Sequence, residues 1–145
     1  MVKKMIKTKI KKILVALDGS KNSYRGLDMG IYLARQCDTK LVGINVISNI
    51  PDTFLGLKYP EKPLLIAADD IMENAKIRCA QNGILFEKKI DFGDPGLKIT
   101  KFAKSLNFDM IIIGARGMSN IKEIFLGSVS NYVLHKSTIP VVVVK

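Results

Sequence analysis

The stretch Gly114-Ala115-Arg116-Gly117 directly follows an apolar run, Met110 to Ile113, that predicts a buried strand. After nine further residues comes Gly127-Ser128-Val129-Ser130, which precedes a predicted helix over 131–136. The two stretches would therefore place backbone N–H groups at the end of a strand and at the start of a helix. Backbone N–H groups and the positive end of a helix dipole together favour an anion such as phosphate.

Glycine and serine at these positions support a phosphate site, but each also has a structural explanation. Gly114 and Gly117 would let the loop bend closely over an anion, although an ordinary strand-to-helix turn also uses glycine. Ser128 and Ser130 could donate their hydroxyls to phosphate, and serine is equally a common N-cap of a helix. Arg116 could face the phosphates or remain solvated on an exposed loop. The presence of the second glycine stretch favours the phosphate interpretation.

Strand and helix patterns alternate along the chain, which predicts an α/β fold with a parallel sheet and right-handed crossovers. Asp94 followed by Pro95 is a typical helix start, and Ser20 or Asn22 is the expected N-cap of the first helix. In the strand over 84–91, apolar and polar residues alternate enough to place it near a sheet edge. The helix over 64–82 is expected to face inward with Ala68, Ile71, Ala75 and Cys79. Apolar runs predict strands over 13–17, 40–47, 84–91, 108–113 and 141–145, and helical spacing predicts helices over 20–37, 64–82, 95–106 and 131–136.

The spacing G-x2-G-x9-G-S resembles the nucleotide-binding signature of the universal stress protein family. Residues 13–20 (ILVALDGS) resemble the first strand and turn of that family, and Val141 to Val144 resembles its last strand, so the similarity covers about 12–145. The resemblance implies a three-layer α/β/α domain over 12–145, of the adenine nucleotide alpha hydrolase-like type, with a five-stranded parallel sheet of order 3-2-1-4-5. It also implies ATP, or the related AMP or ADP, as the ligand. Residues 1–11 remain as a basic N-terminal tail.

The family resemblance also implies roles for residues in other loops. Asp18 would contact the nucleoside, the backbone around Val46 would meet the adenine edge, and Ala16 and Leu17 would lie near the base. From the residues alone, Asp18 is equally a turn residue and Val46 a core residue. In the implied strand order the chain reverses between the first and fourth strands, where ligands bind, so the loops at Asp18 and Gly114 are expected to meet. The complete candidate ligand-binding set is Ala16, Leu17, Asp18, Val46, Gly114, Ala115, Arg116, Gly117, Gly127, Ser128, Val129 and Ser130.

Two further segments predict contacts with other molecules. Val141 to Val144 forms the last strand, and four consecutive valines on an open edge invite uncontrolled pairing unless a second copy covers them. We expect a homodimer through this strand, which the family resemblance implies as well. Residues 48–63 contain three prolines together with several apolar side chains, and our hypothesis is a flap that packs over the site or over a partner.

The composition limits the compartment and the partners. Of the 145 residues 48% are hydrophobic, which excludes a disordered chain. No apolar run approaches the ~18 residues of a membrane span, and no signal peptide is expected. Cys37 and Cys79 form no CxxC motif and are expected to be reduced, core-facing residues in the cytoplasm. The net charge is +10, but six lysines within residues 3–12 leave 17 basic against 13 acidic residues elsewhere. Without a recognition motif, nucleic-acid binding is not expected.

The sequence displays no catalytic constellation, so we assign no catalytic residue. The sequence contains no Walker A, GxGxxG, HExxH or GxSxG pattern. The pair Asp69-Asp70 is expected on the solvated face of a helix, and we assign His135 no catalytic role. Asp18 together with the phosphates is the candidate to hold a divalent ion such as Mg²⁺. Three functions stay open: a nucleotide-dependent regulator or sensor in stress response, which we favour, a dimeric adaptor that binds proteins without nucleotide, and a slow ATPase or a protein that phosphorylates itself at Ser128 or Ser130.

Overall fold

Strands and helices alternate throughout the computed structural model, which describes residues 6, 8–48, 56, 60–117 and 126–145. All strand pairs are parallel, and the sheet order is β3-β2-β1-β4-β5, which confirms the predicted α/β fold and strand order. The elements are β1 (Ile13–Ala16), α1 (Lys21–Cys37), β2 (Leu41–Ile47), α2 (Lys62–Gln81), β3 (Phe86–Phe92), α3 (Pro95–Ser105), β4 (Met110–Gly114), α4 (Ser128–Lys136) and β5 (Val141–Val144).

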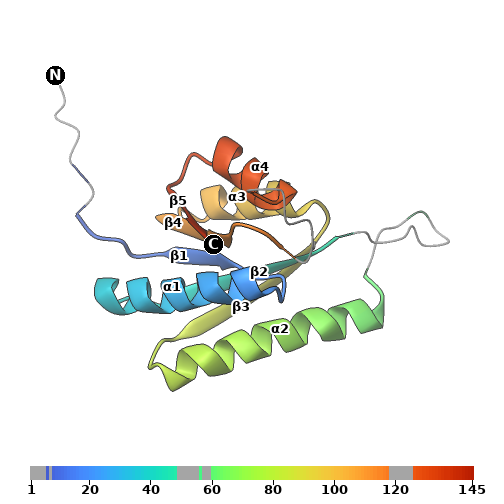
Figure 1. The fold of residues 1–145 in the computed structure, drawn as a ribbon, viewed down its shortest axis with the longest axis horizontal. Helices are drawn as coiled ribbons and strands as arrows, with labels where there is room; N and C mark the ends of the chain where they lie inside the picture. Colours follow the sequence, from blue (N-terminus) through green and yellow to red (C-terminus); the bar gives the residue numbers. More distant parts are fainter. Residues whose placement is uncertain (1–5, 7, 49–55, 57–59, 118–125) are drawn as a thin grey trace.

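The sheet is covered by helices on both faces. Helices α1 and α2 lie on one face, and α3 and α4 lie on the other (Figure 1). Successive residues of β1 point to opposite faces, so Ile13 and Val15 join the core beneath α1 and α2, whereas Leu14 and Ala16 join the core beneath α3 and α4. Because both faces are buried, β1 needs a continuous apolar run rather than an alternating one.

Side-chain caps hold the start of two helices, at Asp94 as the sequence predicted and at Ser20, one of the two positions that the sequence offered. Ser20 is the N-cap of α1, where its hydroxyl accepts a hydrogen bond from the Ser23 N–H at 3.1 Å. Asp94 is the N-cap of α3, where its carboxylate accepts from the Leu97 N–H at 2.8 Å. Each cap satisfies one of the N–H groups that a helix start otherwise leaves without a partner.

The boundaries of several elements differ from the predicted ones. Helix α2 begins at Lys62 rather than residue 64, because Pro63 lies in the first turn, where a helix tolerates proline. Its buried residues are Ala68, Met72, Ala75 and Cys79, whereas Ile71, predicted to face inward, is only half-buried. Strand β3 covers 86–92 instead of 84–91, and its expected edge position is confirmed.

The chain is tied to the sheet from Lys11 onward. The backbone N–H groups of Lys11 and Lys12 both donate to one Asp109 carboxylate oxygen, at 2.7 and 2.9 Å. The Thr39 hydroxyl donates to the Lys11 carbonyl at 2.6 Å.

Most of the predicted basic tail (1–5 and 7) and most of the proposed flap (49–55 and 57–59) lie outside the described residues. Among the residues described, none of the helices is both long and apolar enough to cross a membrane.

The two cysteines differ in burial, and this difference generates a prediction. Cys79 is fully buried on α2, and burial raises the pKa of its thiol to about 11, whereas Cys37 is only half-buried at the end of α1. At pH 8 only about one Cys79 thiol in a thousand is then ionised, and the thiolate is the reactive form. We expect iodoacetamide to modify Cys37 much faster than Cys79 in the native protein, as measured by mass spectrometry of the peptides. In guanidinium chloride both cysteines should react alike, and equal native rates would contradict the described burial.

Candidate functional site

A cavity of about 410 Å³ lies where the carboxyl ends of β1, β2 and β4 meet the starts of α1, α3 and α4. Strands β1 and β4 are neighbours in the sheet although almost a hundred residues separate them, so their following loops reach the same place. The cavity is lined by eleven of the twelve candidate residues, namely Ala16, Leu17, Asp18, Val46, Gly114, Arg116, Gly117, Gly127, Ser128, Val129 and Ser130.

The loops after β1 and β4 touch at Asp18 and Gly117. A Cβ atom built on Gly117 would lie 2.6 Å from Asp18 Oδ2, so the two residues are in close approach. The other carboxylate oxygen of Asp18, Oδ1, accepts from the Ser20 N–H at 2.9 Å. Asp18 therefore acts as a turn residue, the structural explanation left open by the sequence, and also presents its second oxygen at the cavity.

Gly114 and Gly127 have different physical reasons to be glycine. A Cβ on Gly114 would lie 2.7 Å from the backbone of Asn22, so glycine lets β4 end against the first turn of α1. A Cβ on Gly127 would meet only ordinary contacts, the nearest at 3.6 Å, and its φ of −68° suits any residue. The fold thus needs glycine at 114, whereas at 127 the absent side chain leaves space beside the cavity.

Ala115 lies behind the cavity and joins its two glycine stretches. The Ala115 N–H donates to the Val144 carbonyl at 2.7 Å, and the Ala115 carbonyl accepts from the Gly127 N–H at 2.7 Å. The same carbonyl accepts from the Ser130 hydroxyl at 2.8 Å. Ala115 is the one candidate residue absent from the cavity lining, and its backbone groups hold the two glycine stretches together.

The start of α4 borders the cavity without a side-chain cap. Gly127 is its N-cap, so the alternative interpretation of Ser128 or Ser130 as the N-cap is wrong. The Ser130 hydroxyl is buried and donates to the Ala115 and Gly127 carbonyls, whereas Ser128 is exposed. The first-turn N–H groups and the positive dipole end of α4 are consequently available to an anion in the cavity.

Several lining residues were not predicted. Asn45 is 7% exposed and donates from Nδ2 to the Leu17 carbonyl at 2.8 Å, which holds the residue before Asp18 against β2. A single amide inside the apolar strand LVGINVI was a signal that could have identified it. Pro95 and Ile99 give the cavity an apolar wall from α3, and no local pattern marks them because only the packing of α3 brings them there. The remaining unpredicted residues are Ser20, Ser23, Ile44, Ser48 and Ile113.

The charges at the cavity are few. Within the described part of the chain, Asp18 and Arg116 are the charged side chains of the lining, and both are exposed. The described residues contain no group of three or more His, Cys, Asp or Glu side chains that could hold a metal ion. The cavity therefore combines apolar walls, one carboxylate, one guanidinium and free backbone N–H groups, a combination suited to an apolar ring that carries phosphate.

Comparison with known proteins places this chain among stress proteins. Residues 9–145 match the model of the Universal stress protein family. Universal stress protein YxiE of Bacillus subtilis is 34% identical over 145 residues, which cover 92% of this chain and 98% of that protein. The solved structure of MJ0577 from Methanocaldococcus jannaschii aligns with a TM-score of 0.80 and 29% identity, over 95% of this chain and 97% of that one.

A second solved structure shares the fold at lower identity. The universal stress protein from Archaeoglobus fulgidus, in complex with dAMP, aligns with a TM-score of 0.74 over 93% of this chain and 98% of that one. Its identity to this chain is 22%, so this likeness concerns the fold.

Alanine is expected to destabilise the protein at Gly114 but not at Gly127. Gly114→Ala should lower the free energy of unfolding by about 1–3 kcal/mol, because the new Cβ overlaps the backbone of Asn22. Gly127→Ala should leave stability unchanged within about 0.5 kcal/mol, because its Cβ has room. Urea denaturation of both variants measures the difference. Equal destabilisation of the two would show that the close approach at Gly114 is not the constraint described.

Proposed function

The chain belongs to the universal stress protein family, and we propose that it binds an adenine nucleotide, chiefly ATP, and acts in the cytoplasm as a nucleotide-dependent regulator or sensor of the stress response. The observation that carries the proposal is the uncapped start of α4 beside the space at Gly127, at the mouth of a cavity with apolar walls. The dAMP complex of the Archaeoglobus fulgidus relative supports the choice of an adenine nucleotide.

The cavity suggests where each part of the nucleotide lies. The base would occupy the apolar part near Ala16, Leu17 and the backbone of Val46, with Asp18 directed at the ribose. The phosphates would lie between Gly117 and the start of α4, where the N–H groups of Ser128 and Val129 can donate to them. Arg116 supplies a cation at the rim for the outer phosphates. A Mg²⁺ ion, where present, would be held by Asp18 and the phosphate oxygens.

The glycine stretches separate this proposal from the alternative of an adaptor that binds no nucleotide. An adaptor gains nothing from an unfilled space at Gly127 or from an uncapped helix at a cavity, whereas a phosphate uses both. Hydrolysis is not part of the proposal, because the described cavity presents no positioned general base besides the exposed Asp18.

We expect ATP binding to depend on Gly117 and Gly127 and not on a matched glycine elsewhere. Gly117→Val and Gly127→Ala should each weaken ATP binding at least about tenfold, or 1.4 kcal/mol. The valine would displace the Asp18 carboxylate at the site, and the alanine would add a methyl group beside the phosphates. Gly26→Ala is the control, since its Cβ also has room, at 3.6 Å from Ile112, but Gly26 lies outside the cavity lining. Titration calorimetry measures the three affinities, and circular dichroism confirms folding.

The outcome that contradicts the proposal is well defined. The adaptor alternative is favoured if the unmodified protein binds neither ATP nor AMP and if mass spectrometry detects no adenine nucleotide released from the denatured protein. If ATP binds equally to all variants, a nucleotide is bound but the phosphate position is wrong.

We also propose a homodimer through β5. This strand pairs with β4 on one side, ends the sheet order, and its four valines are each only half-buried in the single chain. The opposite edge strand, β3, carries Glu87, Lys88, Lys89 and Asp91, and charged side chains discourage edge-to-edge association. Strand β5 lacks such protection, so pairing with a second β5 about a two-fold axis is the arrangement that covers it.

Val142→Pro tests this interface. Proline removes a strand N–H and should give a monomer or an aggregate, whereas Val142→Thr keeps the N–H and the branched Cβ and should remain a dimer. Light scattering coupled to size-exclusion chromatography measures the mass of each variant. A stable, folded dimer of Val142→Pro would reject pairing through β5.

A further inference from the structure

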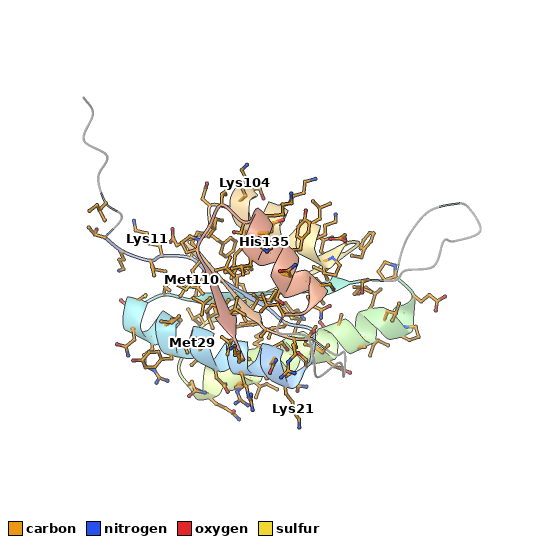
Figure 2. All side chains as sticks on the ribbon, turned by 45° about the horizontal axis from the view of Figure 1, so that its top comes forward. Lys11, Lys21, Met29, Lys104, Met110 and His135 are labelled. Atoms are coloured by element: carbon orange, nitrogen blue, oxygen red, sulfur yellow. The ribbon has the colours of Figure 1, made fainter. Side chains whose placement is uncertain are left out.

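A second groove, of about 660 Å³, lies between α3 and the edge strand β3, away from the proposed nucleotide cavity. Four lysines line it, from both elements: Lys89 of β3 and Lys98, Lys101 and Lys104 of α3. Its one lining carboxylate is Asp91. The groove therefore carries a net positive charge at neutral pH. Figure 2 shows that Lys104 lies on the opposite side of the sheet from Lys21.

Some basic residues outside the groove form close ion pairs with carboxylates. Lys88 pairs with Asp69 and Glu73 at 2.5 and 2.8 Å, and Arg78 pairs with Asp28 at 2.6 Å.

Of the four groove lysines, Lys98 is the one that approaches a carboxylate of the described residues, Asp91, at 3.9 Å. Within the described residues Lys101 and Lys104 form no ion pair, and Lys89 lies over the Phe102 ring, with its Nζ 5.7 Å from the ring centroid. No acidic residue occurs in α3, and like charges one turn apart on a helix repel each other. An anion bound in the groove would relieve this repulsion.

Strand β3 supplies the second half of the site. It stands at the end of the sheet order and pairs with β2, so among the described residues no strand covers its outer side. Lys88 points to the α2 face, where it meets Asp69, whereas Lys89 points to the α3 face, where it meets Phe102. A further strand added to β3 would continue this alternation, because successive side chains of a strand point to opposite faces. Every second side chain of the added strand would then project into the lysine groove.

We propose that β3 and this lysine groove bind an extended acidic segment of a partner protein by strand addition, with carboxylates at alternate positions facing Lys89, Lys101 and Lys104. Main-chain hydrogen bonds to the outer side of β3, which no strand of the described residues covers, supply affinity, and the lysines select for acidic side chains. The proposed partner is not a second copy of this chain, because pairing β3 with β3 would bring two sets of uncompensated lysines together. The site is separate from the proposed nucleotide cavity and shares none of its lining residues.

The probe is a synthetic ten-residue peptide with glutamate at every even position and valine or threonine at every odd one, blocked at both ends and labelled for fluorescence anisotropy. The full-length protein should bind it, and affinity should fall as salt rises. Replacing Lys89, Lys101 and Lys104 together by glutamine should weaken binding about tenfold. Each of the three exposed charge pairs is expected to contribute only part of this loss of affinity. The matched control replaces Lys21, Lys62 and Lys76 of α1 and α2 by glutamine, which changes the net charge equally and should leave the affinity within about twofold.

Two N-methylated forms of the peptide test strand addition itself. One form carries methyl groups on its even amides and the other on its odd amides, so the two have equal charge and composition. Only one set of amides can face β3, and therefore one form should lose binding while the other retains it. Hydrogen exchange of β3 backbone amides should slow in the complex.

Three results would overturn the proposal: no binding of the peptide, equal binding of both N-methylated forms, or equally tight binding of single-stranded poly-uridylate. The last would show a general polyanion surface rather than a strand site. Binding of the peptide to Gly127→Ala should be unchanged, so the outcome is independent of the nucleotide proposal.

Discussion

The position of β1 between β2 and β4 is the constraint on which the rest of the molecule depends. From this central strand the chain builds one half of the sheet through β2 and β3, and then returns to build the other half through β4 and β5. Because all five strands are parallel, the loops that follow β1 and β4 leave the same edge of the sheet and turn to opposite faces. The crevice between those loops is the cavity, and its position follows from strand order rather than from any one side chain.

Backbone hydrogen bonds carry this arrangement to the start of α4. The β5 carbonyl at Val144 holds the Ala115 N–H, and the Ala115 carbonyl holds both the Gly127 N–H and the Ser130 hydroxyl. The uncapped helix start is therefore positioned through one alanine that does not line the cavity. A short chain of bonds also connects the edge strand proposed for dimer formation with the stretch proposed for phosphate, so the two parts of the proposal share one structural support.

Charge is distributed unevenly over the two helical layers. The α1 and α2 side pairs Arg78 with Asp28 and Lys88 with two carboxylates, all at the surface, where each pair contributes little to stability. Among the described residues, the α3 side keeps Lys89, Lys101 and Lys104 without an ion pair, beside a strand edge that no described strand covers. The two sheet edges differ as well, since β5 is entirely valine and β3 is rich in charge. These asymmetries underlie the two proposals, that like chains meet at β5 and that a different partner meets β3.

The sequence by itself determined the alternation of strands and helices, the N-cap Asp94, a choice of Ser20 or Asn22 for the first N-cap, and the two glycine stretches of the cavity. These features are written in short-range patterns: the apolar period, capping chemistry and glycine spacing. The expectation that Ala16, Leu17, Asp18 and Val46 lie near a ligand came from the family resemblance instead. Only the tertiary structure decided that Ala115 lies behind the cavity, that α4 lacks a side-chain cap, and that Pro95 and Ile99 form a wall. It also decided that Lys89 joins the lysines of α3 in one groove. The physical reason is that a residue's neighbours across a sheet depend on strand order and helix packing, which no local pattern contains.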